Sequence, residues 1–270
     1  MTTDTFFTTA RSQALDDSAS SDDYWAAVEA LWAAEPKEVW ALVEPLATSS
    51  DARLQQLCVD VLSRLGDEGQ PLFFETLALF GRIVLGQPTA EVLAAVGQAA
   101  ARFHDPSVVT MLVPHANHPD ASVREAVLHA IRRSSKPEAL VALITLSRDP
   151  VAELREWATF ALGSQLPLVD APEIRAALAE RLVDSHGAVR DEAIVGLGLR
   201  GDARALGPLK AMLERGDVGV ALFEAAAALA SPMLLPALRA LAERGTDSLD
   251  EEERAALHHA VSACSPAGQA

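Results

Sequence analysis

The stretch DPVAELREWATFALG, residues 149–163, decides the fold. Its apolar residue Leu154 is followed by Ala158 four positions on, Ala161 seven on and Leu162 eight on. These spacings place the four side chains on one face of an α-helix. The aspartate that opens the stretch lies in the preceding turn, where its carboxylate can accept an amide proton of the first helical turn. The stretch therefore predicts a capped helix with one buried face.

The same pattern recurs along the whole 270-residue chain. Its first apolar positions are residues 54, 92, 123, 154, 189, 221 and, in a poorer copy, 253. Successive positions differ by 38, 31, 31, 35, 32 and 32 residues. A second apolar run precedes each copy, so each unit has room for two short helices. A repeat of this length predicts a solenoid of stacked helical pairs.

Three central copies share an Asp turn, then Val-Arg or Leu-Arg, then Ala and Leu. They read DASVREAVLHAI at 120–131, DPVAELREWATFAL at 149–162 and DSHGAVRDEAIVGL at 184–197. These copies resemble the HEAT-repeat superfamily, in particular bacterial HEAT-like repeats of the type also found in phycobilin lyases. The resemblance implies an all-α fold, an α-solenoid wound as a right-handed superhelix of about seven HEAT-like helical pairs. Residues 205–264 keep the period without the arginine, and residues 35–106 match loosely.

Two regions are expected along the chain. Residues 1–21 are polar and predicted to be disordered. Residues 22–270 are predicted to form a single HEAT-like α-solenoid. Its N-terminal capping helix would be YWAAVEALW, which has Trp25, Val28 and Trp32 on one face.

The charge of the chain bears on its partners and its location. Lys plus Arg is 22 and Asp plus Glu is 38, a net charge of −16, and such a field repels a phosphate backbone. We therefore expect no nucleic-acid partner. No signal peptide and no membrane span are recognisable, and the two cysteines form no disulfide framework. We expect a cytoplasmic protein with no membrane partner, whereas the oligomeric state stays open.

The residues that could carry chemistry have simple structural interpretations. Cys58 takes a core position and Cys264 lies near the tail, where it could be exposed. His115 and His118 have no third metal ligand nearby in the sequence, so no metal is expected. The segment GLGLRGD is a helix end and turn rather than a phosphate loop. No catalytic motif is recognisable, and we expect a protein without cofactor or enzymatic activity.

Three arginines occupy one column of the repeat. Arg124, Arg155 and Arg190 each follow a turn aspartate. They could form a basic ladder for a ligand. The family resemblance instead implies contacts between arginine and aspartate of neighbouring repeats, and this structural interpretation is preferred.

A candidate protein-binding groove lies on the side of the second helices that points away from the packed face. Positions two, three and six after each reference residue supply acids and aromatic rings. The candidate residues are Glu125, His129, Glu156, Trp157, Phe160, Asp191, Glu192, Phe223 and Glu224. Aromatic anchors beside charges are typical of interaction surfaces. Alternatively, the rings of Trp157 and Phe160 pack between repeats and the acids only solvate the face.

The sequence favours a non-catalytic scaffold or regulator whose protein partner has a basic surface. An immunity-type inhibitor of a basic protein is one form of this hypothesis. A first alternative is an accessory subunit related to HEAT-like bilin lyases, which would need a usable Cys, His or Tyr. A second is a DNA-binding HEAT-like protein, which would need a cationic concave face that the acidic columns do not offer.

Overall fold

The computed structural model describes residues 2–65, 69–243 and 249–266, and within these ranges it is built from helices without strands. The chain divides into two compact units, an N-terminal unit of residues 1–131 and a C-terminal unit of residues 132–270. The expectation of one continuous solenoid over residues 22–270 stays a prediction.

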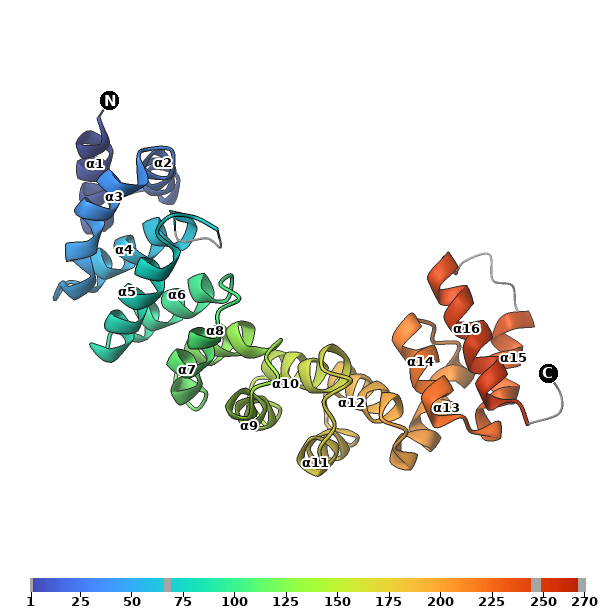
Figure 1. Ribbon diagram of the computed structural model, residues 1–270. Coiled ribbons are helices and arrows are strands. Elements are labelled where there is room, and N and C mark those ends of the chain that lie inside the picture. Colours follow the sequence, from blue (N-terminus) through green and yellow to red (C-terminus); the bar gives the residue numbers. More distant parts are fainter. Residues whose placement is uncertain (1, 66–68, 244–248, 267–270) are drawn as a thin grey trace. The chain divides into compact units, whose positions relative to one another are not determined.

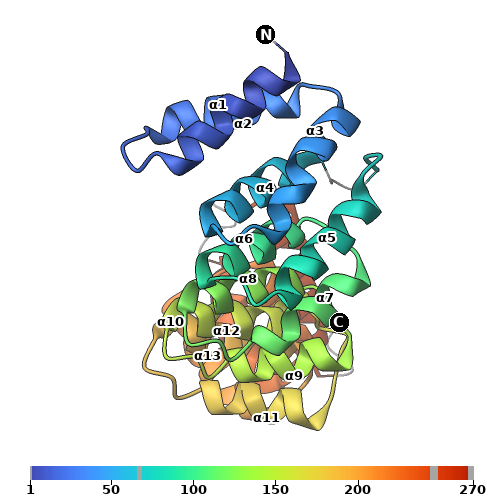
Figure 2. The same cartoon turned by 90° about the vertical axis from the view of Figure 1, so that its left-hand side faces the viewer.

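The N-terminal unit contains helices α1 to α8. Their bounds are α1 Thr3–Leu15, α2 Ser21–Trp32, α3 Pro36–Val43, α4 Ala52–Leu65, α5 Phe73–Leu85, α6 Ala90–Ala100, α7 Pro106–Leu112 and α8 Ala121–Ile131. The second helices of successive pairs, α4, α6 and α8, pack on one another in chain order (Figures 1 and 2). At Gly97 of α6, an added Cβ would lie 2.7 Å from the Cβ of Ala126 in α8. Small residues therefore let these helices approach closely.

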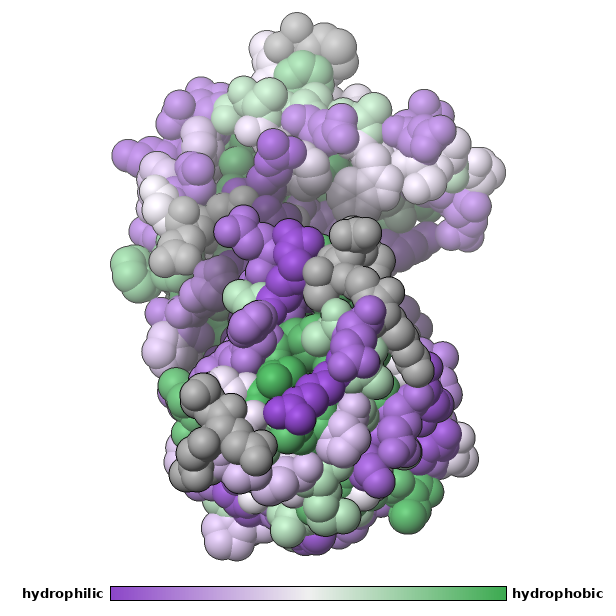
Figure 3. Space-filling view, turned by 90° about the vertical axis from the view of Figure 1, so that its right-hand side faces the viewer, coloured by the Kyte–Doolittle hydropathy of each residue, from purple (hydrophilic) through white to green (hydrophobic). Residues whose placement is uncertain are grey.

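The C-terminal unit repeats this arrangement with helices α9 to α16. Their bounds are α9 Pro137–Leu146, α10 Ala152–Phe160, α11 Pro172–Arg181, α12 Gly187–Leu199, α13 Leu206–Arg215, α14 Val220–Leu229, α15 Leu235–Glu243 and α16 Glu251–Cys264. The second helices α10, α12, α14 and α16 pack in chain order. On the face that carries α15 and α16, hydrophobic residues gather in a strip bordered by hydrophilic residues (Figure 3).

The predicted fold class is confirmed. Each of the seven pattern copies lies in a second helix, and each preceding apolar run forms a first helix. In the first five copies the reference residue is buried, as Val123, Leu154 and Val189 illustrate. Burial of this stripe drives the stacking, because one helix of a pair cannot cover its own apolar face.

The N-terminal segment differs from the expectation of disorder. Residues 3–15 form α1, which lies beside α2 (Figure 2) and also contacts α4. The Thr2 hydroxyl caps the helix by accepting a hydrogen bond from the amide of Thr5. Ala10 is fully buried, and Phe6, four residues earlier on the same face, is half-buried. This narrow apolar stripe is enough to dock a helix, although the segment looks polar by composition.

The column of arginines serves the turns of the repeats. The Nη1 of Arg124 donates to the carbonyls of His118 and Pro119, and that of Arg190 donates to the carbonyls of Asp184 and Ser185. Each arginine thus satisfies carbonyl groups in the turn before its own helix. These contacts support a structural role for the column, although they go to carbonyls of the arginine's own turn. The predicted contact with an aspartate of a neighbouring repeat is present for Arg155, which binds Asp184.

Arg200 has a structural role that the sequence did not reveal. GLGLRGD does form the predicted helix end, with Gly201 at a φ of 62°. The guanidinium of Arg200 is buried as well, and it donates to five carbonyls, those of Leu162, Gly163, Leu166, Val169 and Gly196. Four of these carbonyls belong to residues 161–169, where a π-helical turn at Ala161–Gln165 continues α10. Arg200, which follows α12, therefore fixes the chain at the end of α10, in the preceding repeat, through these hydrogen bonds.

Candidate protein-binding surface

The part of the predicted groove within the C-terminal unit lies on α10 and α12. An added Cβ at Gly196 of α12 would lie 2.5 Å from the Cα of Gly163, in the π-helical turn that continues α10, so the two segments approach closely there. Glu156, Trp157 and Phe160 come from α10, whereas Asp191 and Glu192 come from α12. We refer to these five residues as the α10–α12 surface.

The carboxylates of the α10–α12 surface influence one another. Burial raises the pKa of Glu192, and the charges of Glu156 and Asp191 raise it further. The Ser164 hydroxyl donates to Oε2 of Glu192 at 3.3 Å. On the other side, Nδ1 of His186 lies 3.6 Å from Oε2 of Glu156. The three acids therefore create one local negative field on the two helices.

The aromatic part of this surface reaches solvent. Trp157 is 42% exposed, and its ring meets that of Phe160 edge to face at 5.8 Å between centroids. The Arg132 guanidinium lies over the Trp157 ring, 5.6 Å from the centroid. Phe160 is half-buried. Sequence reasoning missed Arg132, Ser164 and His186, because they lie outside the repeated columns from which the candidates were taken.

Glu125 and His129 belong to α8 in the N-terminal unit. Glu125 is exposed, His129 is half-buried, and Nε2 of His129 lies 3.7 Å from Oε1 of Glu125. That these two residues share a groove with Trp157 stays a prediction.

The structure corrects the prediction for Phe223, which is fully buried rather than surface-facing. The buried residues of α14 are Leu222, Phe223, Ala225 and Ala226, so the stripe starts one residue later than the assumed reference, Ala221. An added Cβ at Gly198 of α12 would lie 2.7 Å from the Cβ of Ala225, which shows the face that α14 turns to its neighbour. Glu224 is exposed on α14, as predicted.

The cysteines and histidines have structural surroundings. Both Cys58 and Cys264 are buried with free thiols, so the expectation that Cys264 could be exposed is wrong. Burial raises the pKa of Cys58 to about 12 and also raises the pKa of Cys264. The Nδ1 of His118 accepts a hydrogen bond from the backbone amide of Asp120. Within the described ranges, no group of three or more potential metal ligands comes together.

The stacked helical pairs agree with a known protein family. The family model of HEAT repeats matches residues 80–163 and 146–230. The chain belongs to the HEAT-repeat family. No curated protein matches its sequence. The described helices include none with the length and apolar character needed to cross a bilayer.

Solved structures of repeat proteins are similar in fold to this HEAT-repeat chain. The Escherichia coli protein YibA is 23% identical, with 96% of this chain and 92% of YibA covered and a TM-score of 0.74. Importin beta is 12% identical, with 95% of this chain and 43% of importin beta covered and a TM-score of 0.60. An engineered protein is 19% identical, with coverages of 96% and 78% and a TM-score of 0.56. At these identities the likeness concerns the fold alone.

Proposed function

We propose that this HEAT-repeat protein is a non-catalytic scaffold or regulator that binds a protein with a basic surface through the α10–α12 surface. The observation that carries the proposal is the exposed ring of Trp157, which meets Phe160 edge to face on the helix that also carries Glu156. An exposed tryptophan offers a large apolar contact area at a small entropic cost, and tryptophan is enriched at binding hot spots.

The charge of the surface supports a basic partner. Glu156 and Asp191 lie close enough to Glu192 for their charges to raise its pKa. A cationic group placed beside the three carboxylates would relieve their mutual repulsion. The net charge of −16 acts in the same direction and opposes binding to nucleic acid. An inhibitor of a basic protein is one form that this function could take. Two free thiols fit a reducing compartment, so we place the protein in the cytoplasm.

The surroundings of the two cysteine thiols do not support the lyase-like alternative. A thiol that attacks or carries a chromophore must be accessible and must ionise readily, whereas Cys58 and Cys264 are both buried with raised pKa values.

The experiment compares two exposed tryptophans. Immobilised wild-type protein, Trp157→Ala and Trp25→Ala are used to capture proteins from a lysate of the native host, with quantification by mass spectrometry. Trp25 is a matched control because it is 41% exposed, against 42% for Trp157, but lies on α2. We expect one or more basic proteins to be retained by wild type and Trp25→Ala and lost from Trp157→Ala.

Affinity and stability measurements complete this test. A hot-spot ring is worth about 2 kcal/mol or more, so Trp157→Ala should weaken binding about 30-fold. Added salt should weaken binding of the wild type, because the carboxylates act through screened charges. Trp157→Ala should cost less stability than Leu162→Ala, which empties a fully buried position. Equal capture by all three proteins, or capture of acidic proteins only, would rule out the proposal.

A further inference from the structure

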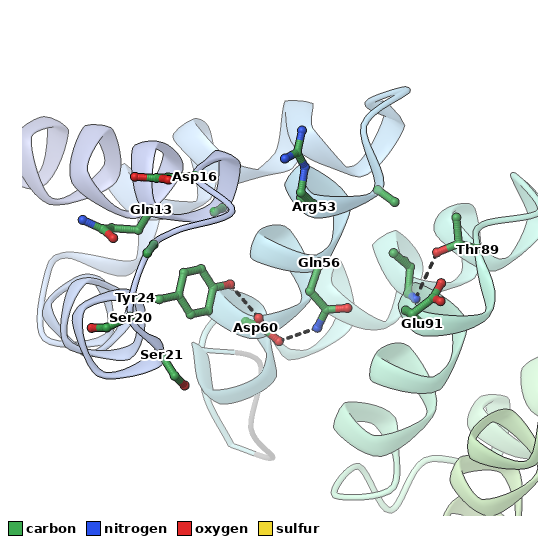
Figure 4. A pocket seen from close by; sticks show the side chains of 14 residues that line it. Gln13, Asp16, Ser20, Ser21, Tyr24, Arg53, Gln56, Asp60, Thr89 and Glu91 are labelled. Atoms are coloured by element: carbon green, nitrogen blue, oxygen red, sulfur yellow. Dashed lines mark hydrogen bonds between the residues drawn. The ribbon is translucent and has the colours of Figure 1, made fainter.

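A pocket of about 450 Å³ lies in the N-terminal unit, bordered by the end of α1, by the turn between α1 and α2, and by residues of α2, α4 and α6 (Figure 4). Its apolar lining comes from Ala14, Ala19, Ala52 and Val92. This volume lies within the range of about 300–1,000 Å³ that is usual for small-ligand sites. The pocket is separate from the α10–α12 surface, so a ligand bound in it is independent of the proposed function.

The polar centre of the pocket is the carboxylate of Asp60. The Tyr24 hydroxyl donates to its Oδ2 at 2.6 Å, and Nε2 of Gln56 donates to its Oδ1 at 2.8 Å (Figure 4). Asp60 is half-buried, and burial raises its pKa. Both donors are neutral, and no cationic side chain of the described residues forms an ion pair with this carboxylate. The carboxylate is therefore held in place without a counter-charge.

The remaining charges around the pocket are also predominantly negative. Asp16 and Glu91 line it and are exposed. Among the described residues that line it, the cation is Arg53, and it is already engaged: Nε and Nη2 bind Asp51 at 3.1 and 2.9 Å, and Nη1 binds Asp17 at 3.1 Å. The pocket lining thus carries three carboxylates, those of Asp16, Asp60 and Glu91, against a guanidinium that already has its partners.

We propose that this pocket binds an aliphatic ammonium or guanidinium group, with the charge at Asp60 and the methylene stem against Ala52 and Val92. A carboxylate oriented by two donors is a favourable acceptor for such a charge-assisted hydrogen bond. The apolar lining contributes by covering the stem. The group can come from a basic side chain of a peptide or from a free amine, and the two sources share this chemistry.

The test uses Tyr24 as a reporter, because it is the single tyrosine of the chain and lines the pocket. The full chain with ¹³C-labelled tyrosine is titrated with three probes, and the NMR signal of the ring is followed. The probes are N-acetylarginine amide, its neutral isostere N-acetylcitrulline amide, and agmatine, a free amine. We expect a saturable shift with the two cationic probes and none with the citrulline probe. Tighter binding of agmatine would indicate a free amine as the source, and tighter binding of the arginine probe a peptide.

Variants separate the pocket from general electrostatics. Asp60→Asn should weaken the binding of the cationic probes about tenfold or more. Glu91→Gln, at an exposed position, should weaken it several-fold and keeps the proposal testable if Asp60→Asn does not fold. Glu29→Gln, which removes one exposed charge of α2 outside the pocket, should leave it unchanged. Equal shifts with the citrulline probe, no saturable shift at all, or equal losses in all three variants would overturn the proposal.

Discussion

The guanidinium of Arg155 binds the carboxylate of Asp184 through two hydrogen bonds, Nε to Oδ2 at 2.9 Å and Nη2 to Oδ1 at 3.0 Å. Arg155 also donates to the carbonyl of Asp149, in the turn before its own helix. Asp184 accepts from the amide of His186 and so caps the turn before α12. One ion pair therefore joins the turns of two successive repeats. Both side chains are largely shielded, with 13% and 5% exposure.

The first prediction concerns this pair in acid. The hydrogen bonds from Arg155 are the main reason why the pKa of Asp184 is lowered. A lowered pKa in the folded state contributes stability above the unfolded value, about 4, and this contribution is lost as the pH falls through the folded value. Asp184→Asn should cost about 3 kcal/mol at neutral pH, because Arg155 loses its buried partner. It should then lose less additional stability than wild type on acidification.

Chemical unfolding followed by circular dichroism, at neutral pH and at about pH 3, measures both effects. Glu180→Gln is the control, since Glu180 pairs with Arg148 at the surface, where both side chains are 46% exposed. An exposed pair of this kind contributes about 0–1 kcal/mol. If Asp184→Asn behaves like Glu180→Gln at both pH values, the pair does not join the repeats.

The second prediction concerns Phe223. Phe223→Ala should destabilise the protein by about 3–5 kcal/mol, because it removes a fully buried ring from the core of the C-terminal unit. Glu224→Ala, at the neighbouring exposed position, should change the free energy of unfolding by about 0.5 kcal/mol or less. Denaturant unfolding compares the two variants. If Phe223→Ala lowers the free energy of unfolding only slightly, Phe223 belongs to the candidate surface and not to the core.

The third prediction concerns the close approach of α12 to the π-helical turn Ala161–Gln165 that continues α10. In Gly196→Ala the new Cβ would meet the Cα of Gly163 at 2.5 Å, so the helices must separate. We expect a loss of about 1–3 kcal/mol from overpacking. Gly207→Ala is the matched control in α13, where an added Cβ has nothing within 4 Å. It should stabilise the helix by about 0.5–1 kcal/mol. Thermal melts measure the change in melting temperature of each variant. A change in the same direction for both would contradict the close approach of Gly196 to Gly163.

The fourth prediction concerns the alkaline titration of Tyr24. Burial, followed by the charge of Asp60, raises the pKa of Tyr24 above its usual value of about 10. A raised pKa in the folded state means that stability is fully present below the unfolded value and is lost as the pH rises above it. The near-ultraviolet absorbance of tyrosinate should therefore appear late, together with unfolding. Asp60→Asn should lower the pKa of Tyr24, since a repelling charge is removed, and an unchanged titration would show that the two groups do not interact.

Residues on one face of one helix could be predicted well. The apolar positions of 123–131, 154–162 and 189–197 identify second helices, because the helix period depends only on local geometry. The pairing of Arg155 with Asp184, a turn aspartate of the next repeat, could also be inferred, since a repeated polar residue usually serves the repeat. Phe223 was misplaced because Ala221 and Leu222 both fit a helical stripe, and only the packing of α14 on α12 chooses between them.

The sequence by itself determined the class of fold, the positions of the helical pairs and the negative charge of the chain. These properties are local or additive, so they can be summed along the chain. Tertiary structure alone decided the exposure of Trp157, the buried carbonyl contacts of Arg200 and the pocket at Asp60. The physical reason is that each depends on groups from different helices, up to about 80 residues apart around the pocket, and no sequence period records which of these groups meet.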